Sequence, residues 1–118
     1  MFDLMSEDNI VRKIAVIFVT DVVGFSKLME KNEEQTLRSF RACKEILDNL
    51  FEEHGGKIFN TAGDSVLAEF QSAVSAVICA SEFQKLIKQR NASLNNEDAQ
   101  MRFRIGINMG DVIVEDQN

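Results

Sequence analysis

The sequence from Ile14 to Ser26 reads I-A-V-I-F-V-T-D-V-V-G-F-S, and the rest of the chain is interpreted from it. Its first six residues form an unbroken apolar run rich in β-branched side chains, which is typical of a strand buried on both faces. Asp21 follows the run, and Gly24 comes three residues later, before a predicted helix start. A carboxylate favours a cation here, while turn N–H groups and a helix N-terminus favour phosphate. The stretch therefore predicts half of a metal–nucleotide site.

Composition limits the class of protein. A chain of 118 residues is long enough for one domain with a hydrophobic core. The net charge of −6 argues against a nucleic-acid-binding surface, but a bound divalent cation would still allow a nucleotide ligand. The sequence shows no signal peptide and no apolar run of membrane-spanning length. We expect a cytoplasmic protein, or the cytosolic part of a larger one.

The first long helix is predicted from residue 33 to His54, with Gly55 as its left-handed cap. His54 is the only histidine, and we interpret it as a helix-end residue favoured by the helix dipole. Cys43 and Cys79 fall inside helical patterns without metal-ligand spacing. We expect buried free thiols, although the count alone allows a disulfide.

A β-hairpin is predicted next, with strands at 57–60 and 66–70 around a Gly63-Asp64 turn. Ser72 is the expected N-cap of a second long helix that reaches Gln89, followed by a polar loop over 90–100. The predicted inner face of that helix consists of six apolar residues: Val74, Val77, Ile78, Phe83, Leu86 and Ile87.

The last predicted strand, 101–108, alternates between apolar and polar residues. Gly110 and Asp111 predict a turn into a further strand that stops with the chain, which indicates a cut through the domain. Residues 1–10 predict a polar lead-in whose apolar members could pack on the body: Phe2, Leu4 and Met5. The element order predicts an α+β, ferredoxin-like (split βαβ) fold, with an antiparallel-containing sheet and both helices on one face.

This topology places Asp21 and Asp64 at one edge of the sheet. Two neighbouring carboxylates are best neutralised by one or two Mg²⁺ or Mn²⁺ ions, with substrate phosphates completing the coordination. Two structural alternatives stay open at this point: Asp21 could cap the helix that begins near Gly24, and Asp64 could be an ordinary turn residue.

Three motifs carry a resemblance to a known family. F-V-T-D-V-V-G-F-S (18–26) resembles the first metal-binding motif of the class III adenylate/guanylate cyclase catalytic domain. G-G-K-I-F-N-T-A-G-D-S-V-L-A-E-F (55–70) and F-R-I-G-I-N-M-G-D-V (103–112) are similar to its second and third motifs, in the same order and spacing. A diguanylate cyclase would instead show a G-G-[D/E]-E-F type hairpin. The resemblance makes residues 1–118 a single domain, the N-terminal part of such a catalytic domain.

The resemblance implies a nucleotidyl cyclase, which converts ATP, or GTP, to the cyclic nucleotide and pyrophosphate with two metal ions per site. Asp21, Asp64 and the backbone carbonyl of Val22 would hold the metal ions. Arg104 would reach the phosphates, although a solvent-facing strand arginine is an equal alternative. The N–H groups of one segment would hold the triphosphate: Val23, Gly24, Phe25 and Ser26.

The sequence departs from the family at two points. The purine-selecting position holds Lys in adenylyl and Glu in guanylyl cyclases. Here it is Asn60, which indicates neither adenine nor guanine. The family's transition-state Asn and Arg would lie beyond residue 118 and act across a head-to-tail homodimer. We therefore expect the chain alone to be inactive in intracellular cyclic-nucleotide signalling. Two further alternatives are a non-catalytic cyclase homologue that binds nucleotide or dimerises, and a purely structural module.

Overall fold

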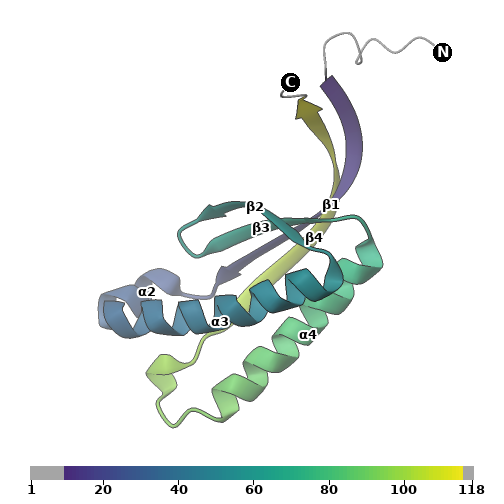
Figure 1. Ribbon diagram of the computed structural model, residues 1–118. Coiled ribbons are helices and arrows are strands. Elements are labelled where there is room, and N and C mark those ends of the chain that lie inside the picture. The colour runs from purple at the N-terminus through teal and green to yellow at the C-terminus, as the bar shows by residue number, and fades with distance from the viewer. Residues whose placement is uncertain (1–9, 116–118) are drawn as a thin grey trace, which may run out of the picture.

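The computed structural model describes residues 10–115 as a four-stranded sheet with helices on one side (Figure 1). The predicted lead-in with Phe2, Leu4 and Met5 lies outside the described residues. The elements follow one another in this order: β1 (Ile10–Val22), α2 (Phe25–Lys31), α3 (Glu33–His54), β2 (Lys57–Ala62), β3 (Ser65–Phe70), α4 (Ala73–Ala92), the 3₁₀ turn η1 (Glu97–Ala99) and β4 (Phe103–Glu115).

The strand order is β2-β3-β1-β4, and every neighbouring pair is antiparallel. Helices α3 and α4 lie across the same face of the sheet (Figure 1). This confirms the predicted ferredoxin-like α+β fold. Among the described helices, none combines the length and the apolar character that crossing a bilayer requires.

Caps set the ends of both long helices, and two of them, Gly55 and Ser72, were predicted. The Asn32 side chain accepts a hydrogen bond from the Gln35 N–H at the start of α3, and Gly55 ends that helix at φ 83°. Ser72 caps α4 as predicted. Helix α4 runs to Ala92, however, so the polar loop predicted from residue 90 begins too early. Asn91 continues the helix and binds the backbone of Met101 through both amide atoms, at 2.7 and 3.1 Å.

The core lies between the helices and the covered face of the sheet. Three aromatic rings centre it: Phe18 meets Phe51 edge to face at 5.1 Å between centroids, and Phe70 lies 5.7 Å from each. Cys43 and Cys79 are buried and free, as expected. Packing therefore holds the part of β1 that leads to Asp21. Four residues of this part are buried: Val16, Phe18, Thr20 and Val22.

The apolar run in β1 is not buried on both faces, so that prediction was wrong. Val19 is 38% and Ile14 is 68% exposed. The helices cover one face only, and β1 extends past them with β4 as a two-stranded ribbon (Figure 1). An apolar run thus marks a strand here without marking burial on both faces.

The predicted inner face of α4 was also largely wrong. Phe83 and Ile87 are buried, but four other members are exposed: Val74, Val77, Ile78 and Leu86. The buried stripe instead contains Ala76 and Cys79, both 0% exposed. These small side chains let α4 pack closely against its neighbours. A prediction based on large apolar residues overlooks them.

The turn predicted at Gly110-Asp111 does not exist, and the described residues contain no further strand after it. Residues 103–115 form one strand, in which Gly110 pairs with Ala15 and Asp111 with Ile14. Gly110 is not among the positive-φ glycines of the described chain. Strand β1 begins at Ile10 and supplies a continuous partner for the ladder, so β4 continues without a turn.

Candidate functional site

The register of β1 and β4 places Asp21 directly opposite Arg104. The two side chains form a bidentate pair, with Arg104 Nε 2.8 Å from Asp21 Oδ1 and Nη2 3.0 Å from Oδ2. Opposed residues in an antiparallel ladder are close enough for this fork-to-carboxylate geometry. Their neighbours Thr20 and Val22 are buried on the helix side, so the pair lies on the open face of the sheet.

The β2–β3 turn brings Asp64 to the same place. Thr20 pairs with Val66, which sets the turn beside the end of β1. Gly63 takes φ 59°, and Asp64 Oδ2 accepts a hydrogen bond from the Val22 N–H at 2.8 Å. Asp64 is therefore more than a turn residue, because its carboxylate binds the neighbouring strand. The predicted neighbours Asp21 and Asp64 do lie together.

A hollow of about 450 Å³ opens at this corner. Eight residues line it: Asp21, Val22, Gly24, Phe25, Ser26, Lys27, Asp64 and Arg104. Gly24 is the N-cap of α2 in a left-handed conformation, and no side chain caps the helix. Asp21 is thus not the helix cap, which removes that alternative. The first turn of α2 faces the same hollow as both carboxylates.

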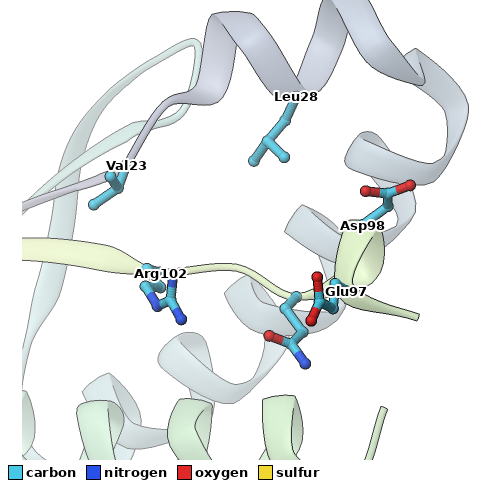
Figure 2. Close-up of a pocket in the computed structure, with 6 residues that line it drawn as sticks. Val23, Leu28, Glu97, Asp98 and Arg102 are labelled. Atoms are coloured by element: carbon cyan, nitrogen blue, oxygen red, sulfur yellow. The ribbon is translucent and has the colours of Figure 1, made fainter. Parts of the chain in front are cut away.

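Two residues of the predicted site lie apart from this hollow. The Val23 N–H donates to the carbonyl of Arg102 at 2.8 Å, so it is not free to bind phosphate. Figure 2 shows Val23 beside a different hollow, of about 360 Å³, which Arg102 and Glu97 also line. Asn60 is exposed on β2, opposite Leu67, and is not among the residues that line the Asp21 hollow.

Sequence reasoning missed two residues at the site. Thr20 is 1% exposed, and its hydroxyl donates to the carbonyl of Arg104 at 2.8 Å, which fixes the backbone under the arginine. Lys27 adds a cation to the lining. Lys27 could have been predicted, because it follows the predicted helix start near Gly24. The hydrogen bond of Thr20 depends on strand register and could not.

The comparison with protein families is decisive at this point. Residues 7–116 match the family described as the adenylate and guanylate cyclase catalytic domain. The chain belongs to this family. It is 42% identical over 115 residues to a putative adenylate cyclase 3 of Rhizobium meliloti, covering 97% of this chain and 19% of that protein.

Solved structures agree with the family. An adenylate/guanylate cyclase/hydrolase from Silicibacter pomeroyi matches with a TM-score of 0.80 and 36% identity, over 93% of this chain and 64% of that one. The guanylate cyclase domain of RhGC from Catenaria anguillulae, in complex with GTP, shares the fold at 17% identity and a TM-score of 0.71, over 92% and 64% of the chains. The chain thus spans about a fifth of its curated relative and under two thirds of these structures.

The donor set of this cyclase domain suits a hard divalent cation. Asp21 and Asp64 supply carboxylate oxygens beside the Val22 backbone, and Mg²⁺ and Mn²⁺ prefer oxygen ligands. The hydrogen bond to Asp21 and that residue's negative charge raise the pKa of Arg104; burial opposes them, and the charge of Asp64 adds a smaller increase. The arginine therefore stays cationic and neutralises part of the cluster.

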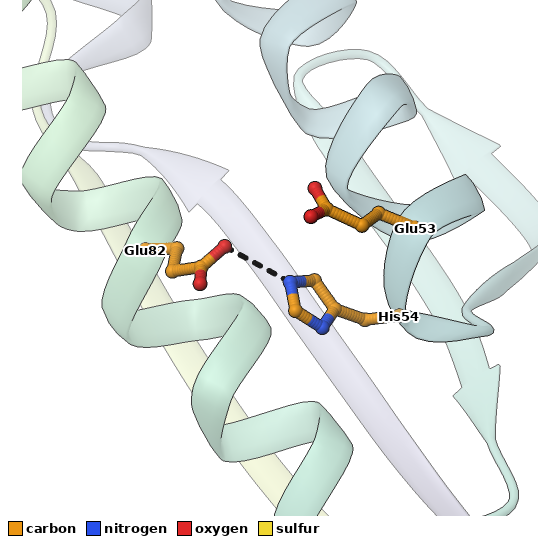
Figure 3. Close-up of side chains that lie close together, drawn as sticks. All are labelled: Glu53, His54 and Glu82. Carbon is orange, nitrogen blue, oxygen red and sulfur yellow. Dashed lines mark hydrogen bonds and ion pairs between the residues drawn. The ribbon is translucent and has the colours of Figure 1, made fainter.

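A second cluster of the cyclase domain joins the ends of two helices. His54 is the last residue of α3, as predicted, and its Nε2 lies 2.9 Å from Glu82 Oε2 on α4, a partner that the sequence did not indicate (Figure 3). Glu53 lies beside them, and one possible ligand atom from each residue falls within 4.8 Å of the others. Because the histidine already pairs with Glu82, this cluster ties α3 to α4.

Proposed function

We propose that this chain forms the metal- and phosphate-binding half of a nucleotidyl cyclase site, with ATP as the preferred substrate. The observation that carries the proposal is the shared hollow, in which Asp21 and Asp64 face the first turn of α2. The chain's membership of the cyclase family supports the assignment of this hollow to the reaction. The products would be cyclic AMP and pyrophosphate, released for intracellular signalling.

Asp21 and Asp64 would hold two Mg²⁺ or Mn²⁺ ions, together with the backbone carbonyl of Val22. Bound metal ions supply Lewis-acid stabilisation of the transferred phosphoryl group and of the attacking ribose oxygen. The hydrogen bond from the Val22 N–H to Asp64 orients that carboxylate toward the hollow, where it would meet the cations.

The triphosphate would lie against the start of α2. The N–H groups of Gly24, Phe25 and Ser26 would bind it, with Lys27 and Arg104 as cationic partners from the lining of the hollow. Val23 is dropped from this set because its N–H is already bonded to Arg102. The remaining groups would position the α-phosphate for in-line attack by the ribose 3′-oxygen.

ATP is favoured over GTP by the likeness to an adenylate cyclase at 42% identity. Asn60 supports neither base, because its amide can donate or accept at a base edge. It also favours the second candidate, a non-catalytic cyclase-homology domain that binds nucleotide or dimerises. The intact pair of Asp21 and Asp64 favours the enzyme.

A homodimer in the cytoplasm would complete the site with a transition-state Asn and Arg from the other subunit, as the family resemblance implies. Apolar side chains exposed on one face of the β1–β4 ribbon support an interface: Ile14 at 68%, Met109 at 60% and Ile113 at 66%. The chain alone would then bind substrate but form little cyclic nucleotide.

Calorimetry with a non-hydrolysable ATP analogue and Mg²⁺ tests the proposal. We expect the native chain to bind, the variant Asp64→Ala to lose binding, and the variant Asp48→Ala to behave as native. Asp48 is a matched control because it is an exposed aspartate on α3 whose ion pair is with Lys44, away from the hollow. Equal binding by native protein and Asp64→Ala, or no binding by either, would overturn the metal site. A GTP analogue that binds more tightly would overturn the preference for ATP.

A further inference from the structure

Arg104 is hydrogen-bonded to Asp21, a carboxylate that the proposed metal ions require. Both oxygens of Asp21 accept hydrogen bonds from one guanidinium, at 2.8 and 3.0 Å. A cation coordinated by Asp21 would bring further positive charge to a group that the arginine already neutralises. Arginine does not release its proton in proteins, so this competition cannot be relieved by deprotonation. The same carboxylate thus has two competing positive partners.

Displacing Arg104 would require only its side chain to move, because its backbone is fixed. Its side chain is 71% exposed, against 31% for Asp21. The Thr20 hydroxyl bonds the Arg104 carbonyl at 2.8 Å, and the β1–β4 ladder holds the Cα positions. Rotation about side-chain torsions alone would carry the guanidinium away from Asp21, and no strand has to shift. Arg104 also lines the hollow into which it would turn.

We infer that Arg104 is the counter-ion of Asp21 in the metal-free chain, that a divalent cation must displace it, and that nucleotide phosphates then take it up. This inference rests on the proposed function. It makes the binding of metal and nucleotide cooperative, because each ligand favours the same displaced position of one side chain. Arg104 thus weakens the binding of metal alone and strengthens the binding of metal with nucleotide.

The size of the effect follows from the exposure of the pair. Exposed ion pairs shift an equilibrium by about one- to fivefold, and a bidentate arginine lies at the upper end of this range. Without nucleotide, the variant Arg104→Gln should therefore bind Mn²⁺ about two- to fivefold more tightly than the native chain. With a non-hydrolysable ATP analogue present, the same variant should bind Mn²⁺ more weakly than native, so the order of affinities reverses.

The test measures free Mn²⁺ by its paramagnetic resonance signal, with and without the ATP analogue. Arg102→Gln is the matched control, because Arg102 lies two residues away on the same chain segment, is exposed, and lines the other hollow. It removes the same charge without touching Asp21, so its affinities should stay near native. Circular dichroism checks that each variant is folded.

The outcomes separate this inference from the proposed function. If Arg104→Gln binds Mn²⁺ no more tightly than Arg102→Gln while Asp64→Ala removes binding, the displacement of Arg104 is wrong and the metal site stands. If affinities do not reverse when nucleotide is added, the cooperativity is wrong. If the native chain shows no Mn²⁺ binding that depends on Asp64, both the inference and the proposed function fail.

Discussion

Two clusters of acidic side chains in the described part of the chain join different elements, and they differ in what surrounds them. Asp21 and Asp64 lie on the open face of the sheet, where a glycine turn and a short helix border a hollow. Glu53 and Glu82 flank His54 between α3 and α4 (Figure 3). The first cluster offers only oxygen donors and is partly neutralised by an exposed arginine, whereas the second contains an imidazole that is 17% exposed. Carboxylates alone therefore do not identify a nucleotide site.

The largest expected effect is the loss of stabilisation by ligands, which should occur for variants of the first cluster and not of the second. The double variant Asp21→Asn/Asp64→Asn should lose the thermal stabilisation that Mn²⁺ and an ATP analogue give to the native chain. At about 100 times the dissociation constant, that stabilisation is about 2.7 kcal/mol. The matched variant Glu53→Gln/Glu82→Gln should keep it, because its carboxylates lie away from the hollow. Loss of stabilisation in the glutamate variant alone would reverse the assignment of the two clusters.

A smaller effect, on stability, tests whether the chain after His54 is tightly packed and serves the fold rather than nucleotide binding. A Cβ atom at Gly56 would lie 2.6 Å from Phe70 Cζ and 2.8 Å from Phe51 Cδ1, both in the core. Gly56→Ala should therefore destabilise the chain by about 1–3 kcal/mol in urea unfolding, with nucleotide affinity unchanged in the folded protein.

Gly110→Ala is the control, since a Cβ there meets nothing within 4 Å. Equal stability of the two alanine variants would show that the chain after His54 is not tightly packed. A change in nucleotide affinity at Gly56→Ala would connect the two regions that we keep separate.

Local sequence signals explain which parts of the fold and of the site could be predicted. The strand–helix–hairpin–helix–strand order is visible because caps such as Asn32 and Ser72 and the Gly63-Asp64 turn carry local signals. That order alone places Asp21 near Asp64, so the centre of the candidate site was predictable. The bonds of Thr20 and Val22 depend on strand register, which no local pattern in this chain specifies.

Side-chain partners between distant elements were not predictable either. The Arg104–Asp21 pair and the His54–Glu82 pair join residues separated by 83 and 28 positions. The burial of α4 was misjudged for a related reason: two apolar stripes fit one helix, and only its packing against α3 and the sheet selects the stripe with Ala76 and Cys79. A predicted turn at Gly110 failed because β1 supplied a longer partner.

The smallest effect concerns Cys79, a buried thiol close enough to the second cluster to sense its charge. Burial first, then the negative charges of Glu82 and Glu53, raise the pKa of Cys79 to about 11. The folded chain therefore keeps this proton while an unfolded thiol, with a pKa near 9.0, loses it. Folding stability should fall as the pH rises from about 9 toward 11, because over that range the unfolded chain binds fewer protons than the folded one.

Glu82→Gln removes one of these negative charges, so it should lower the pKa of Cys79 and reduce the stability that is lost between pH 9 and pH 11. Urea unfolding at both pH values measures this loss for the native chain and for each variant. Asp21→Asn is the control and should leave the loss unchanged, since the first cluster does not contribute to the pKa of Cys79 or Cys43. If Asp21→Asn reduced the loss as much as Glu82→Gln does, the two clusters would be electrostatically joined, and their separation would be wrong.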